Sequence, residues 1–188
     1  MGILITSSRR PNPRLRTFCK DLARVLPDAI KVNRGKMSIE EVALKAYQLK
    51  IDHVVIVGKG RGGNPGRLIF IKVYEDRYEV LPLIIGIHGV TLIREIPEAS
   101  IPTTVKTAVI AIKSECLKVG ESLSDSLGLP FIEVSRLQDT QGLSDIILWI
   151  DSLKQGYVFK FINGLSLKLS GPIIRVNKVV YKCPLTLQ

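Results

Sequence analysis

Apolar and polar residues in the first third of the chain follow two alternating periods, which predicts strands separated by helices. Short apolar runs at Ile3–Thr6, Ala29–Val32 and His53–Val57 have the length and β-branched content of buried strands. Between these runs, apolar residues recur every three or four positions in residues 12–26 and 38–49, as on one face of a helix. Strands that alternate with helices predict parallel α/β units with right-handed crossovers.

Capping residues mark where the two helices begin and end. Asn12 is a favourable N-cap, and Pro13 suits the first helical position because an N–H there would have no partner. Pro27 stops the first helix. Ser38 and Glu41 have the spacing of a capping box at the start of the second helix. These signals agree with the apolar periodicity and set the helix boundaries.

An antiparallel hairpin is predicted after the third strand. Two β-rich runs, Leu68–Tyr74 and Tyr78–Ile87, flank the short polar turn 75–77. The segment that follows, Gly89–Thr104, contains two prolines and is expected to connect the first half of the chain to the second.

The second half of the chain shows the same order of elements. The predicted elements are strand Ala108–Ile112, a helix from Ser114 to Gly128, strand Phe131–Val134, a helical stripe from Leu143 to Leu153, strand Tyr157–Ile162, and closing strands Leu165–Leu169 and Ile173–Tyr181. Gly156 is expected to end the second of these helices.

Two pairs of segments align at nearly constant shifts. Ala29–Asn33 lies over Phe131–Ser135 at a shift of 102 residues. Gly66–Ile69 lies over Gly171–Ile174 at a shift of 105 residues. Similar shifts at separate places predict an internal duplication.

The predicted fold class is therefore α/β, with two similar βαβαβ-type halves. The halves are residues 1–88 and 105–188, joined by 89–104. Each half is expected to contain a mixed sheet covered by helices. Because the strands read as apolar on both faces, the two halves are expected to pack together.

Length and composition are those of a globular chain. The 188 residues are 46% hydrophobic and 23% charged, which is enough apolar content for a buried core. The apolar runs fall short of the roughly 20 residues that cross a bilayer, and the N-terminus lacks the basic region of a signal peptide. We therefore expect a cytoplasmic protein that has no membrane partner.

Cysteine and histidine residues show no pattern of a metal site. Cys19, Cys116 and Cys183 are far apart and odd in number, and His53 and His88 are the two histidines. This spacing argues against a zinc site and against a disulfide framework. We expect no metal and no cofactor, and a packing role for Cys19.

Positive charge is concentrated in the first half of the chain. The formal net charge is +10. Residues 1–87 hold 16 Lys and Arg against 8 Asp and Glu, a net of +8, whereas residues 88–188 hold 11 against 9, a net of +2. A merely solvated basic surface does not require such clustering, so the skew favours a localised anionic partner.

Three short basic loops account for this concentration, and each follows a predicted strand. They are residues 7–16, 33–36 and 58–67. Their candidate RNA-binding residues are Ser7, Ser8, Arg9, Arg10, Arg14, Arg16, Arg34, Lys36, Lys59, Arg61 and Arg67. Because the carboxyl ends of parallel strands meet at one edge of a sheet, the three loops are expected to form one site.

The chemistry of these loops suits phosphate. Guanidinium groups bind phosphate in a bidentate manner, and the helix that begins after Asn12 directs its positive N-terminal end toward the same edge. An alternative for Arg16 is a position on the outer face of that helix. Aromatic residues make up 6% of the chain and none lies in the loops, so stacking of unpaired bases is not indicated. The loops therefore predict recognition of folded RNA through its backbone.

An enzyme is the less favoured functional class. Gly58, Gly60 and Gly63 match the G-x-G-x-x-G pattern of dinucleotide-binding loops, but a β-rich run follows where that motif requires a helix. Neither His53 nor His88 has a recognisable nucleophile or carboxylate partner in the sequence. A nucleotide-binding enzyme stays a minor alternative.

A protein-interaction scaffold within a ribonucleoprotein assembly is the main alternative. The strand ends expected in the second half carry Ser114-Glu115, Ser135-Arg136 and Asn163-Gly164. These positions are nearly uncharged, so the second half is expected to contact protein partners rather than RNA.

The basic loops resemble those of a known family. The segments Ile5–Arg9 with Pro11, then Arg34–Lys36, then Gly62–Leu68 are similar to the Brix domain of ribosome-biogenesis proteins. The compact length resembles the archaeal single-domain members, which are similar to the Brix protein of the eukaryotic small-subunit processome. The resemblance implies one Brix domain over residues 1–188 and a noncatalytic factor that binds ribosomal RNA or its precursor and assists its folding or processing. It also implies halves that resemble anticodon-binding domains of class II aminoacyl-tRNA synthetases, and ribosome-assembly proteins as partners of the second half.

Overall fold

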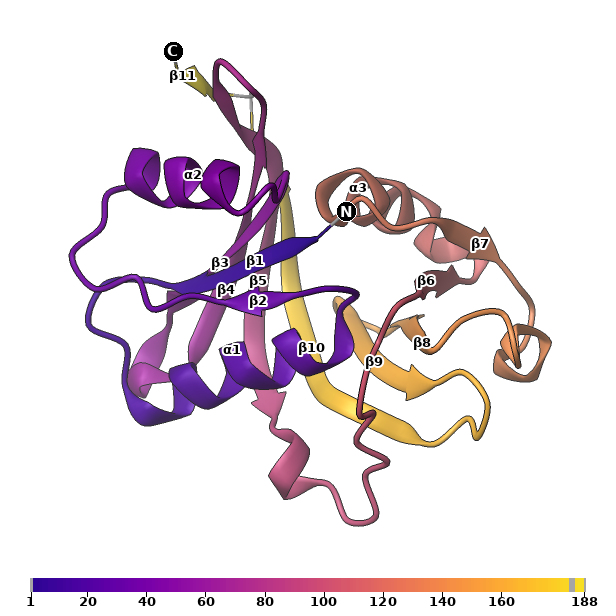
Figure 1. Cartoon of the computed structure of the whole chain (residues 1–188). Helices are drawn as coiled ribbons and strands as arrows, with labels where there is room; N and C mark the ends of the chain where they lie inside the picture. The colour runs from indigo at the N-terminus through magenta and orange to yellow at the C-terminus, as the bar shows by residue number, and fades with distance from the viewer. Residues whose placement is uncertain (1, 183–184, 188) are drawn as a thin grey trace.

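One mixed sheet of eleven strands, with three α-helices packed against it, forms the part of the chain that the computed structural model describes (Figure 1). The described residues are 2–182 and, by their backbone, 185–187, so Cys183 lies outside them. The helices are α1 (Pro13–Val25), α2 (Ile39–Gln48) and α3 (Leu117–Leu127). The strands are β1 (Ile3–Ser7), β2 (Ile30–Lys31), β3 (His53–Lys59), β4 (Pro65–Val73), β5 (Tyr78–Thr91), β6 (Ala108–Ile112), β7 (Phe131–Glu133), β8 (Ile146–Ser152), β9 (Tyr157–Asn163), β10 (Leu169–Tyr181) and β11 (Leu185–Leu187).

Two sets of five strands meet at the middle of this sheet. The order is β2-β1-β3-β4-β5-β10-β9-β8-β6-β7, and β11 pairs with the first residues of β5. In the first set β1 is parallel to β2 and β3, and β3, β4 and β5 are successively antiparallel. In the second set β6 is parallel to β7 and β8, and β8, β9 and β10 are successively antiparallel. The two sets therefore share one pairing order and join through the antiparallel pair β5–β10.

The helices of the first half begin where their capping residues predicted. The Oδ1 atom of Asn12 accepts a hydrogen bond from the backbone N–H of Leu15 at 2.9 Å, which caps α1. At α2, the backbone N–H of Glu41 donates to Ser38 Oγ at 3.2 Å, and the N–H of Ser38 donates to a Glu41 carboxylate oxygen at 2.6 Å. Both predicted caps are confirmed.

Alternate residues of β1 contribute to two different cores. Ile3 and Ile5 belong to the core that α1 covers, whereas Leu4 belongs to the core that α2 covers on the opposite face (Figure 1). The core beneath α1 continues into the second half, where it includes Leu123 of α3 and Phe159 of β9. One continuous apolar core thus joins the halves. The prediction of a separate mixed sheet in each half is wrong, because the pairing of β5 with β10 makes one sheet of both.

Two predictions for the second half are wrong. The predicted helical stripe Leu143–Leu153 contains β8 instead. Its residues Ile146–Ile150 are buried on both faces between β6 and β9, and a fully apolar run fits a buried helix and a central strand equally well by period. Leu165–Leu169 is mainly the turn before β10, and one continuous strand begins at Leu169.

The shift of 105 residues is also wrong as a structural equivalence. Gly66 lies in β4, whereas Gly171 lies in β10, and the strand that matches β10 by pairing order is β5. The shift of 102 residues does relate matching strands, since β2 and β7 hold corresponding places at the two ends of the sheet. The loop between β7 and β8 contains a 3-10 turn at Leu137–Thr140 where the first half has α2.

Candidate nucleic-acid interface

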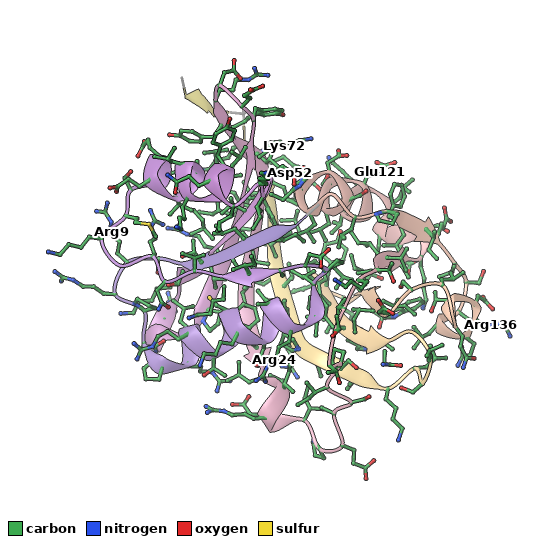
Figure 2. The ribbon with its side chains drawn as sticks, in the orientation of Figure 1. Arg9, Arg24, Asp52, Lys72, Glu121 and Arg136 are labelled. Carbon is green, nitrogen blue, oxygen red and sulfur yellow. The ribbon has the colours of Figure 1, made fainter. Side chains whose placement is uncertain are left out.

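Three basic loops leave one edge of the sheet together, as predicted. They follow β1, β2 and β3, which are adjacent and parallel, so their carboxyl ends share an edge. We call residues 7–16, 33–36 and 58–67 the loop cluster. Figure 2 shows Arg9 extending from this edge into solvent.

The first and third loops touch each other. A Cβ atom at Gly63 would overlap the side-chain amide of Asn12, the residue that caps α1. Gly63 also has a φ of +80°, a left-handed conformation that glycine adopts without strain. The backbone N–H of Ser8 donates to the carbonyl oxygen of Val57 at 2.8 Å, which ties the start of the first loop to β3. The third loop is therefore seated against the N-terminus of α1.

Close backbone approach explains the glycines of the third loop. A Cβ atom at Gly60 would lie 2.8 Å from the Cα atom of Gly66, so a side chain at this position would separate the loop ends. The Arg67 side chain lies across Gly58, so a Cβ atom at Gly58 would collide with it. The loop forms a 3-10 turn at Arg61–Gly63 and leads into β4 rather than into an α-helix. This geometry differs from that of a dinucleotide-binding loop.

The second loop lies close enough to the first for their charges to interact. The Arg34 guanidinium is half-buried, and its Nε donates to the carbonyl oxygen of Met37 at 3.0 Å. Burial, and secondarily the positive charge of Arg9, lower the pKa of Arg34 from its ordinary value, although Glu40 opposes this effect. Neighbouring like charges of this kind are relieved by a bound anion.

Most cations of the loop cluster have no carboxylate partner. Apart from Arg16, which lies on α1, the loop-cluster residues that form no ion pair with any residue from 2 to 182 are Arg9, Arg10, Arg34, Lys36, Lys59, Arg61 and Arg67. All of them except Arg34 are exposed. Seven unpaired cations at one sheet edge form a surface suited to a polyanion.

Four predicted site residues are not free groups at the exposed sheet edge. Arg14 pairs with Glu95, with Nη2 at 3.0 Å from Oε2, and the same nitrogen donates to the Val90 carbonyl at 2.8 Å. The hydrogen bond from Arg14 is the main reason that the pKa of Glu95 falls below its usual range. Arg16 is exposed on the outer face of α1, which was the alternative for this residue. Ser7 is only 6% exposed, and the Ser8 hydroxyl is buried with no hydrogen-bond partner among the described residues.

Comparison with known proteins identifies the family. No family model matches the chain. A probable Brix domain-containing ribosomal biogenesis protein of Sulfurisphaera tokodaii is 34% identical over 173 residues, which cover 92% of this chain and 90% of that relative. The chain belongs to the Brix-domain family. A relative of the same description from Pyrococcus abyssi is 40% identical over 93 residues, half of this chain and 41% of its own length.

Solved structures share the fold of this Brix-domain chain. The crystal structure of a probable ribosomal biogenesis protein from Aeropyrum pernix superimposes with a TM-score of 0.77 at 26% identity, and covers 96% of this chain and 98% of that one. Mil, an archaeal Imp4-like protein, superimposes with a TM-score of 0.66 at 22% identity over 95% of this chain and 99% of its own, which shows a common fold. The resemblance indicated by the basic loops is thus confirmed at the level of family.

The corresponding edge of the second half of this Brix-domain chain has a different chemistry. Ser114 donates to a Glu133 carboxylate oxygen at 2.5 Å, and Ser152 donates to Glu115 at 3.2 Å. Asp151 accepts from Lys160 at 3.0 Å. The carboxylates of Glu115, Glu133 and Asp151 at this edge are therefore hydrogen-bonded to other residues of the chain. The strand that matches β3 is β8, so the matching strand end is Ser152 and not the predicted Asn163-Gly164.

Other candidate chemistry lies away from the loop cluster. The side chain of His53 is 3% exposed, and its Nδ1 lies 3.1 Å from Asp52 Oδ1, a carboxylate neighbour that the sequence analysis overlooked. His53 is the first residue of β3 and Asp52 directly precedes it, at the end of the strand opposite the basic loops. In the described parts of the chain, no three His, Cys, Asp or Glu side chains gather as metal ligands. None of the described helices is long and apolar enough to cross a membrane.

A row of cations on α1 escaped the sequence analysis. Lys20 and Arg24 are exposed and follow Arg16 at intervals of four residues, so all three lie on one helix face. The four-residue spacing of these cations in the sequence could have indicated a basic helix face, but the predicted site was limited to the loops at the strand ends. Arg94, from a distant part of the sequence, lines the same groove as Lys20 and Arg24.

Proposed function

We propose that this Brix-domain protein is a noncatalytic factor in ribosome biogenesis that binds ribosomal RNA or its precursor. In this proposal the loop cluster holds the phosphate backbone of folded RNA, and binding assists the folding or processing of that RNA. The main support is the set of seven unpaired cations at one sheet edge. The names of the relatives, all ribosomal biogenesis proteins, support the choice of ribosomal RNA as the polyanion.

The physical argument rests on charge and shape. Unpaired arginines and lysines displace counterions from a nucleic-acid backbone, and this release supplies most of the sequence-independent binding free energy. The glycines of the third loop bring bare backbone to the surface beside Arg61, where N–H groups can approach phosphate oxygens. Aromatic side chains are absent from residues 7–16, 33–36 and 58–67, so binding by base stacking has no support.

A salt series on RNA binding tests the proposal. With about 6 phosphate contacts, affinity for an RNA duplex should fall roughly 10³-fold between 50 and 200 mM salt. A variant with Arg9→Glu, Arg10→Glu and Arg61→Glu should lose binding, while its thermal unfolding temperature stays nearly unchanged because these side chains are exposed. A salt-independent affinity, or full affinity in this variant, would refute the proposal.

A second proposal concerns the second half, which we infer contacts assembly proteins rather than RNA. The supporting observation is that Glu115 and Glu133, at the strand ends of this half, are hydrogen-bonded within the chain. RNA binding should therefore protect backbone amides of the loop cluster from hydrogen exchange and leave residues 113–115 and 133–135 unprotected. Protection of the second set by RNA would contradict this division.

We further propose that the two halves arose by internal duplication and that each is related to an anticodon-binding domain. The shared pairing order of β1–β5 and β6–β10 supports the duplication. Superposition of the two strand sets on each other and on an anticodon-binding domain tests both statements. Different strand directions or crossover connections in the superimposed sets would count against them.

A further inference from the structure

A stripe of unpaired cations extends away from the loop cluster along α1. Arg16, Lys20 and Arg24 are exposed, and none of them forms an ion pair with any residue between 2 and 182. Four residues of α-helix advance by about 6 Å, so the charged groups lie at nearly even intervals along about 12 Å. Figure 2 shows Arg9 beyond the N-terminal end of α1 and Arg24 near its other end.

A fourth cation joins the stripe from the segment that links the two halves. A groove of about 490 Å³ separates α1 from residues 93–101, and its lining includes Lys20, Arg24 and Arg94. Arg94 lies in a 3-10 turn that runs from Ile93 to Glu95. In the described residues Arg94 also has no ion-pair partner.

Contacts from two side chains of α1, Asp21 and Arg14, hold this turn against the helix. Asp21, which is 3% exposed, accepts from the backbone N–H of Ile93 at 3.0 Å. Arg14 pairs with Glu95 at the other end of the turn. The position of Arg94 beside the helix is therefore fixed by the fold rather than by chance contact of an exposed loop.

The negative charge in the groove is small. Glu98 is the one exposed carboxylate among the lining residues of the groove. The pKa of Asp21 is raised from its usual value chiefly by burial, although the Ile93 N–H and the charges of Arg24 and Arg94 oppose this. Three cations thus face one exposed acid, and a phosphate backbone would complement the excess.

We infer that Lys20, Arg24 and Arg94 form a second phosphate-binding surface, which extends the loop cluster along α1 and is suited to an RNA duplex. We call Lys20, Arg24 and Arg94 the α1 stripe, and Arg16 is counted with the loop cluster. The inference rests on the proposed function, because it assumes that the loop cluster holds RNA. It adds the residues of a second contact and the structural class of the RNA.

The span and the side-chain types favour a duplex over a single strand. The 13 residues of α1 cover about 20 Å, so the loop cluster and the far end of the stripe can engage phosphates on both sides of a groove in a rigid helix. Single-stranded RNA gains affinity from stacking on aromatic side chains, and the groove lining contains none. A rigid duplex also presents its phosphates to fixed cations with less ordering than a flexible strand requires.

The salt dependence of RNA binding reports the number of phosphate contacts that the protein makes. The probe is an RNA duplex of about 16 base pairs, the length that a double-stranded-RNA-binding domain covers. In a variant with Lys20→Gln, Arg24→Gln and Arg94→Gln, the slope of log affinity against log salt should become shallower by about 2 to 3, since each lost phosphate contact removes about 0.9. A matched variant with Lys154→Gln, Lys168→Gln and Lys178→Gln removes the same charge from exposed lysines of the second half and should keep the wild-type slope.

The possible outcomes separate this inference from the proposed function. If the α1-stripe variant keeps the wild-type slope while the variant at Arg9, Arg10 and Arg61 loses binding, the stripe inference is overturned and the proposed function stands. If the variant at Arg9, Arg10 and Arg61 keeps full affinity, the proposed function itself fails. Equal affinity for the duplex and for one of its single strands would overturn the assignment to duplex RNA. Unchanged thermal unfolding temperatures show that each variant is folded.

Discussion

Replacement of Gly63 by alanine should destabilise the protein through the contact between two basic loops. The φ of +80° at Gly63 is a left-handed conformation, which costs a residue with a Cβ atom about 1–2 kcal/mol. The new methyl group would also overlap the Asn12 amide and displace it. Because Asn12 caps α1, loss of its hydrogen bond costs about 1 kcal/mol more. The expected total is roughly 2–3 kcal/mol in the free energy of unfolding, measured with urea.

A double-mutant cycle isolates the part that passes through Asn12. Asn12→Ala alone should cost about 1 kcal/mol. The double variant should lose no more stability than Gly63→Ala alone, because Gly63→Ala by itself already removes the Asn12 cap. The coupling between the two positions should therefore be about 1 kcal/mol.

Gly142 provides a matched control for the backbone strain. Its φ is +82°, and a Cβ atom there would meet nothing within 4 Å. Gly142→Ala should cost about 1–2 kcal/mol and show no coupling to Asn12→Ala. If Gly63→Ala and Gly142→Ala prove equally costly and equally uncoupled, then the first and third loops do not touch in solution as described.

Three further predictions concern single side chains. The pKa of Glu95 is lowered from its usual value of 4.5, so its contribution to stability is present above that value and is lost as pH falls through the folded-state pKa; the stability difference between wild type and Glu95→Gln should vanish in acid, and urea titrations across pH that show a constant difference would contradict this. Burial raises the pKa of Cys19 to about 12, so an aromatic disulfide reagent at neutral pH should leave Cys19 unmodified until denaturant is added; rapid modification of Cys19 in the native protein, assigned by peptide mapping to separate it from Cys116 and Cys183, would be the opposing result. Phe159→Ala should cost about 3–5 kcal/mol and keep one unfolding transition, because Phe159 lies in the core shared by both halves; separate transitions by Trp149 fluorescence and by circular dichroism would indicate independent halves.

Local signals in the sequence were sufficient for the first half of the fold. The caps at Asn12 and Ser38 and the apolar periods between them are properties of neighbouring residues, so they could be read without the fold. The segment Ile146–Ile150 was different, because it is apolar at every position and its period is ambiguous. The fold resolves the ambiguity through the backbone pairing of this segment with β6 and β9, which no local pattern records.

The candidate site was predictable in outline and not in detail. Parallel neighbouring strands require the three loops to meet at one edge, and the structure places them there. The pairing of Arg14 with Glu95 spans 81 residues, and the approach of Arg94 to α1 depends on the same fold of the linking segment. Contacts at such separations follow from tertiary packing, so composition and spacing could not separate the paired Arg14 from the unpaired cations around it.

Photo-crosslinking of the purified protein to duplex RNA, with the attached peptides mapped by mass spectrometry, tests the central claim most directly. The proposal predicts that crosslinks concentrate within residues 7–16, 33–36 and 58–67, with the variant at Arg9, Arg10 and Arg61 losing them. Crosslinks confined to residues 113–115 and 133–135, the corresponding edge of the second half, would contradict the assignment of RNA binding to the loop cluster.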